Sequence, residues 1–94
     1  MEINIRYSHK LREIVKKREE VIQIREQASL KDLLSLLSKK YGEEFEQYVY
    51  SGLRGKGLPI VFLIDGKNVS QLGGLETALL NSCVVTMIPP IAGG

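Results

Sequence analysis

The C-terminal end of the sequence offers the group whose chemistry is easiest to assign. The last six residues are Pro89, Pro90, Ile91, Ala92, Gly93 and Gly94. A carboxylate becomes an acyl donor only when another enzyme activates it, for example as an acyl-adenylate. Two prolines favour an extended root, and glycine without a Cβ passes a narrow channel. Six extended residues span roughly 20 Å. We predict that this tail delivers the carboxyl group of Gly94 to the active site of a partner.

Other reactive side chains give weaker signals. His9 is the only histidine and has no identifiable serine or cysteine partner, so a catalytic role is disfavoured. Cys83 is the only cysteine, which excludes an internal disulfide or a cysteine-rich metal site. Residues 51–59 contain three glycines, but no helix start follows them, which favours a surface loop over a phosphate loop. We therefore expect a protein without a permanently bound cofactor or metal and without a catalytic centre of its own.

Length and composition predict one soluble domain. The chain has 94 residues, of which 44% are hydrophobic and 26% charged. A net charge of +2 is too small to predict nucleic-acid binding, and no apolar stretch approaches the roughly 20 residues of a membrane span. The N-terminus lacks the apolar segment of a signal peptide. We expect a cytoplasmic protein with no nucleic-acid or membrane partner.

The first half of the chain predicts a β-hairpin followed by a helix. Residues 2–7 alternate apolar and polar, and residues 21–25 form the expected antiparallel partner strand. Between them a short helix is expected after Ser8 as its cap, followed by a solvated charged turn at 16–20 or, alternatively, a docking surface there. The main helix is expected over 29–42 because Ser29 is a good cap, leucines recur at helical spacing, and a glycine ends the pattern.

The second half predicts three further strands. After a possible short helix near Phe45, residues 60–64 form a continuous apolar run, which predicts a central strand covered on both faces. Asp65-Gly66 is typical of a type I′ turn. In the last strand, residues 83–88, Val85 and Met87 share one face, and Ile88 points to the other as an apolar docking spot beside the tail.

These elements predict an α+β fold in which one main helix packs across a mixed sheet. The domain is expected over residues 1–88 and the tail over 89–94. The sequence resembles β-grasp, ubiquitin-like sulfur carriers of the MoaD/ThiS group over its whole length. The resemblance is carried mainly by residues 72–79 (LGGLETAL) and 84–94 (VVTMIPPIAGG), and the proline pair is closer to the MoaD branch.

The resemblance implies a carrier rather than an enzyme. An E1-like adenylyltransferase of the MoeB/ThiF type would use ATP to adenylate Gly94, and sulfur transfer would leave a C-terminal thiocarboxylate. The recipient would be a molybdopterin synthase large subunit of the MoaE type, or another sulfur acceptor enzyme. Gly94 would carry the sulfur, Gly93 and residues 89–92 would thread the partner's channel, and Ile88 would contact the partner surface.

Three alternatives stay open at this point. The protein could instead modify lysines of other proteins through Gly94, or supply sulfur for cysteine or another metabolite. It could also be a plain β-grasp binding module with an incidental tail. Ile88 stands where the family often has phenylalanine before the proline pair, and Ser82-Cys83 stands where it often has Gly-Asp. These differences leave the particular partner undecided.

Overall fold

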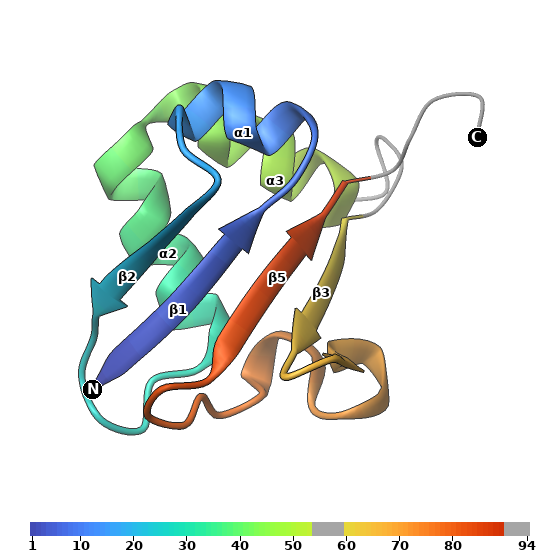
Figure 1. Ribbon diagram of the computed structural model, residues 1–94. Helices are drawn as coiled ribbons and strands as arrows, with labels where there is room; N and C mark the ends of the chain where they lie inside the picture. Colours follow the sequence, from blue (N-terminus) through green and yellow to red (C-terminus); the bar gives the residue numbers. More distant parts are fainter. Residues whose placement is uncertain (54–59, 90–94) are drawn as a thin grey trace.

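The computed structural model describes residues 1–53 and 60–89 of the chain. The strands are β1 (Glu2–Tyr7), β2 (Glu19–Gln23), β3 (Val61–Ile64), β4 (Lys67–Asn68) and β5 (Val84–Ile88). The helices are α1 (Lys10–Val15), α2 (Leu30–Tyr41) and α3 (Glu43–Leu53), with two 3₁₀ helices, η1 (Val69–Gln71) and η2 (Gly74–Glu76). The helices lie behind one face of the sheet, which leaves the other face open (Figure 1). The expected α+β class and β-grasp arrangement are confirmed.

The sheet is mixed, with strand order β2-β1-β5-β3-β4. β1 pairs with β2 in the predicted hairpin and runs parallel to β5 on its other side. β5 in turn is antiparallel to β3. The last strand therefore lies in the middle of the sheet, and its C-terminal end lies beside the C-terminal end of β1 (Figure 1).

The prediction that residues 60–64 are covered on both faces is wrong. Phe62 and Ile64 are buried under the helices, whereas Val61 is 38% exposed and Leu63 is half-buried. β3 lies next to the two-residue edge strand β4, and no helix among the described residues covers the outer face. The apolar run thus has an alternating environment even though its sequence does not alternate.

Helix α2 starts and ends as its sequence predicts. The Ser29 hydroxyl accepts a hydrogen bond from the backbone N–H of Asp32 at 3.2 Å, and the Asp32 carboxylate accepts from the Ser29 N–H at 2.9 Å. This reciprocal pair is a capping box. Gly42 ends the helix at φ 91°, a conformation that glycine adopts without strain.

The helical layer is larger than expected, because α3 is almost as long as α2. Its Phe45 and Val49 are fully buried, and the helix extends to Leu53, into the segment predicted to be a loop. The rest of that predicted loop, residues 54–59, lies outside the described residues. Four leucines of α2 and three residues of β1 form the centre of the core: Leu30, Leu33, Leu34, Leu37, Ile3, Ile5 and Tyr7.

The predicted solvated turn at 16–20 ends in a carboxylate that is largely buried. The Glu20 side chain is 8% exposed and accepts hydrogen bonds from the Tyr7 hydroxyl at 2.6 Å and from the Tyr41 hydroxyl. Lys40 Nζ lies 2.8 Å from the same carboxylate and Lys17 Nζ lies 3.5 Å from it. The Glu20 cluster (Tyr7, Lys17, Glu20, Lys40 and Tyr41) therefore links β1 and β2 to the end of α2.

Opposing effects set the pKa values in the Glu20 cluster. Burial by itself would raise the pKa of Glu20, but the hydrogen bonds from Lys40, Tyr41 and Tyr7 and the charge of Lys40 outweigh it and lower the pKa to about 2. Burial, together with the Glu20 carboxylate, raises the pKa of Tyr7 well above its ordinary value. At neutral pH the Glu20 carboxylate is therefore ionised, accepts hydrogen bonds from the Tyr7 and Tyr41 hydroxyls and lies beside two lysines.

Candidate functional site

The root of the predicted tail lies at the end of a central strand. β5 alternates as predicted, with Val85 and Met87 buried under the helices and Thr86 and Ile88 half-exposed on the open face. Pro89 follows as a buried residue. The other predicted tail residues (Pro90, Ile91, Ala92, Gly93 and Gly94) lie outside the described residues. The structure thus places Ile88 and Pro89 where the chain leaves the sheet between the ends of β1 and β3.

Side chains from the start of α1 hold this root in place. The Ser8 hydroxyl donates a hydrogen bond to the Met87 carbonyl at 2.8 Å, and Arg12 Nε donates to the Tyr7 carbonyl at 2.9 Å. The prediction that Ser8 caps α1 is wrong, because His9 occupies the cap position and no side-chain capping bond forms there. Ser8 instead ties the end of β5 to the segment after β1. Sequence reasoning missed this role because the two partners are 79 residues apart.

Partly exposed apolar side chains lie along β3 and β5 on the open face, from Val84 at the start of β5 to Ile88 at the tail root. The strand register places Ile88 directly opposite Val61, and Thr86 opposite Leu63. On the other side of β5, Val84 pairs with Asn4 and Thr86 with Arg6. We call Val61, Leu63, Val84 and Ile88 the open-face patch. Neighbouring partly exposed apolar side chains of this kind are characteristic of surfaces that bind another protein.

A shallow groove continues the open face toward the edge strand. It has a volume of about 370 Å³, and its lining includes Asn4, Arg6, Glu19, Val21 and Val84. Val21 on β2 is 54% exposed. The surface around the patch is thus polar and charged on the β2 side, where Arg6 lies directly opposite Glu19.

The two reactive side chains of the sequence lie at opposite ends of the sheet. His9 follows the C-terminal end of β1, whereas Cys83 precedes the N-terminal end of β5, which is parallel to β1. Cys83 is 3% exposed, and burial raises the pKa of its thiol. Cys83 is therefore not placed to be activated by His9. Among residues 1–53 and 60–89, no group of three or more histidine, cysteine or acidic side chains is placed to hold a metal ion.

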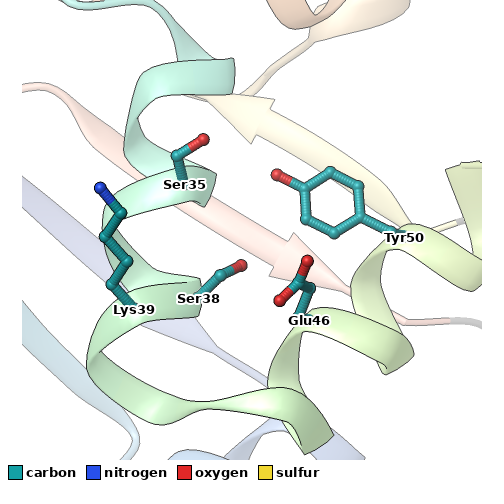
Figure 2. Close-up of a pocket in the computed structure, with 5 residues that line it drawn as sticks. All are labelled: Ser35, Ser38, Lys39, Glu46 and Tyr50. Atoms are coloured by element: carbon teal, nitrogen blue, oxygen red, sulfur yellow. The ribbon is translucent and has the colours of Figure 1, made fainter.

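A polar pocket lies on the helical side of the molecule, between α2 and α3. It has a volume of about 300 Å³ and is lined by Ser35, Ser38, Lys39, Glu46 and Tyr50. Figure 2 shows the two serines facing Glu46 and Tyr50, whereas the Lys39 side chain points away from these α3 residues. The Ser38 hydroxyl is buried and makes no hydrogen bond within the described part of the chain. None of the residues that line this pocket belongs to the open-face patch.

The architecture is that of a ubiquitin-like β-grasp protein. The ThiS family profile matches residues 5–94, nearly the whole chain. The chain belongs to the ThiS family. No helix among the described residues has the length and apolar character needed to cross a bilayer.

The chain is similar to several individual proteins along all or nearly all of its length. Small archaeal modifier protein 3 of Haloferax volcanii is 28% identical over 94 residues, with complete coverage of both chains. The solution structure of the Haloferax volcanii HVO 2177 protein is also 28% identical, with a TM-score of 0.80 over 100% of this chain and 87% of that one. Subunit 1 of a molybdopterin converting factor from Pyrococcus furiosus has a TM-score of 0.77 at 22% identity, covering 97% and 99% of the two chains, and this likeness concerns the fold alone.

Proposed function

We propose that the protein is a sulfur carrier whose terminal residue, Gly94, is converted to a thiocarboxylate. The observation that carries the proposal is the ThiS family match, which includes the final Gly93-Gly94. In the structure, the segment that contains these glycines follows β5, which ends beside the open-face patch. In the proposed reaction a Gly94 carboxylate oxygen attacks the α-phosphate of ATP and pyrophosphate leaves. A sulfur nucleophile then displaces AMP from the acyl carbon. Both steps take place in an E1-like adenylyltransferase.

The role of the domain in this proposal is to dock and to orient the tail. A partner that covers the open-face patch would bury Ile88 and Val61 and gain the free energy of removing them from water. The Ser8 hydrogen bond fixes the position from which the tail departs. The tail root would therefore have a fixed position at the edge of the surface that a bound partner covers.

The proposed sulfur acceptor is a molybdopterin synthase large subunit. The resemblance of residues 84–94 to the MoaD branch supports this choice. The proline pair before the Gly-Gly end supports it as well. The acceptor would take the sulfur from Gly94 into the dithiolene of the molybdenum or tungsten cofactor.

A second function is favoured by a specific observation, the 28% identity to small archaeal modifier protein 3. In that case the activated Gly94 carbonyl would be attacked by a lysine amine of another protein, giving an isopeptide bond. The two functions share activation of the tail and differ in the nucleophile that accepts the acyl group. Sulfur supply to cysteine or another metabolite is a variant of the first function.

Mass spectrometry separates these possibilities. The protein is incubated with ATP, a cognate E1-like enzyme and a sulfur source, and the C-terminal peptide is analysed. Exchange of one oxygen for sulfur on Gly94 supports the carrier function, and Gly-Gly remnants on lysines of other proteins support the modifier function. A variant lacking Gly94 should give neither product while its melting temperature stays unchanged, because the last buried residue in the described part of the chain is Pro89, five positions before Gly94. If the intact protein gives neither product, the proposal is wrong. If the carrier product forms, transfer to a molybdopterin synthase large subunit or to a cysteine synthase identifies the acceptor.

A further inference from the structure

The outer edge of β2 pairs with no other strand in the described part of the chain. β2 ends the sheet, and among the described strands its neighbour is β1 (Figure 1). The N–H of Tyr7 donates to the Arg18 carbonyl at 2.8 Å, and the N–H of Ile24 donates to the Met1 carbonyl at 3.0 Å. Pairs in an antiparallel ladder alternate between bonded and non-bonded. In the register given by Ile3 opposite Ile22, the even-numbered residues of β2 therefore point their backbone groups toward β1.

The odd-numbered residues of β2 consequently point their backbone groups outward. These are Glu19, Val21 and Gln23, and no other described residue forms a backbone–backbone hydrogen bond with them. Their side chains lie on the open face, because the alternate residue Ile22 is buried under the helices. Val21 is the most exposed large apolar side chain of any strand described here, at 54%. An edge of this kind can accept another strand.

The charge pattern along this edge is self-complementary in one register. If two copies pair antiparallel about a two-fold axis at Ile22, Val21 lies opposite Gln23 of the second copy and Glu19 lies opposite Arg25 of the second copy. The Val21–Gln23 pair is of the bonded type, since both residues point their backbone groups outward. Arg25 lies two residues beyond the end of β2, and its carbonyl accepts from the Ala28 N–H at 3.4 Å, so the Glu19–Arg25 contact would be an ion pair of side chains. Two-fold symmetry repeats the Glu19–Arg25 ion pair on the other side of the axis. The neighbouring register, centred on Val21, places Lys17 opposite Arg25, and like charges directly opposite each other are destabilising.

The surroundings of Glu19 and Arg25 suit this pairing. Arg6 lies opposite Glu19 within the same chain, so the carboxylate would lie between two guanidinium groups. The Arg25 side chain is 65% exposed, and its guanidinium donates from Nη2 to Asp32 at 2.7 Å and from Nη1 to the Glu26 carbonyl at 3.3 Å. A guanidinium has five N–H donors, so donors beyond these two hydrogen bonds remain for Glu19 of the second copy. We propose that β2 is a self-association edge at which a second copy of this chain pairs antiparallel, in the register that joins Glu19 to Arg25.

The pairing has a geometric consequence for the tails. The β2 strands of the two copies run in opposite directions, so the β5 strands do too, and the two tail roots lie at opposite ends of an extended sheet. The open-face patch, which includes Ile88, is not covered by the second copy. A single strand pair buries little area compared with a stable dimer, so we expect a weak dimer with a dissociation constant of about 0.1–1 mM.

Sedimentation velocity of the full chain between about 20 μM and 1 mM tests this proposal. The weight-average sedimentation coefficient should rise with concentration at low salt and rise less in 0.5 M NaCl, because exposed ion pairs are screened. Glu19→Arg and Arg25→Glu should each raise the dissociation constant about tenfold, since each places like charges opposite at two symmetric positions. The double variant, which has the original net charge, should restore association.

Matched controls separate edge pairing from general charge effects and from misfolding. Glu13→Arg makes the same change in net charge as Glu19→Arg but lies on α1, and it should leave association unchanged. Val21→Pro removes only an outward N–H, so it should abolish association while the melting temperature changes little. A monomer at every concentration overturns the proposal. So does association that persists in Val21→Pro, or a double variant that associates no better than the single variants.

Discussion

The Glu20 cluster makes a prediction whose magnitude follows from the structure. In Glu20→Gln the amide oxygen can still accept from Tyr7 and Tyr41, but the negative charge facing Lys40 and Lys17 is lost. A pKa lowered from 4.5 to about 2 corresponds to about 3 kcal/mol of stabilisation. The two lysines are 43% and 41% exposed, so solvent screens part of this interaction. We therefore expect a loss of about 2 kcal/mol in the free energy of unfolding at pH 7.

The pH dependence identifies the charge as the cause. A carboxyl group with a lowered pKa in the folded state contributes stability above its unfolded pKa, and this contribution is lost as the pH falls toward the folded pKa. For Glu20 the window runs from pH 4.5 down to about 2. The difference between the wild type and Glu20→Gln should therefore shrink from about 2 kcal/mol at pH 7 to about 1 kcal/mol at pH 3.

Urea unfolding at pH 7 and pH 3, followed by circular dichroism, measures this difference. Glu19→Gln is the matched control, because the neighbouring Glu19 carboxylate is exposed on the open face and should contribute less than about 0.5 kcal/mol. At pH 7 the melting temperature of Glu20→Gln should fall by about 10 °C for a domain of this size. An equal loss at both pH values would show that packing, not charge, is responsible. Absence of any loss at pH 7 would refute the stabilising role of the cluster.

Two further substitutions test the start of α2 and the tail root. Ser29→Ala removes the hydroxyl of the capping box and should lower the free energy of unfolding by about 1 kcal/mol in urea titrations, whereas Ser35→Ala, in the middle of the same helix, should be neutral or slightly stabilising. Equal effects would contradict the capping argument. Ile88→Asp should weaken binding to the activating enzyme at least tenfold in titration calorimetry while the domain stays folded, and Leu80→Asp, which alters a 71% exposed leucine before the start of β5, should not. Unchanged affinity of Ile88→Asp would remove this residue from the interface.

Features with a local cause could be predicted from the sequence. The capping box depends on residues three positions apart, and the two faces of β5 follow from the two-residue period of a strand. The turn at Asp65-Gly66 was predictable for the same reason, and both residues have positive φ angles, 49° and 85°. The sequence alone therefore predicts that Ile88 lies on the open face, beside the tail.

Features that depend on distant pairing could not be predicted. Glu20 meets Tyr7, Lys40 and Tyr41 at separations of 13, 20 and 21 residues, and a charged run gives no sign that one of its members is buried. The apolar run at residues 60–64 predicts a strand that is covered on both faces, because continuous apolar strands are usually buried on both sides. The sequence cannot show that the helices all lie on one side. Partner binding is the proposed role of the apolar side chains on the other side.

The centre of the open face and its β2 edge differ in a way that bears on both proposals. At the centre, β3 and β5 present apolar side chains with few charges, and the tail root lies at their edge. At β2 the same face ends in Glu19, Val21 and Gln23, beside Arg6 and Arg25. An apolar centre favours a large partner that excludes water, whereas a charged edge favours a weak contact that is specific in register. The same sheet can therefore hold a partner enzyme at β3 and β5 and a second copy of the chain at β2, because neither contact uses the residues of the other.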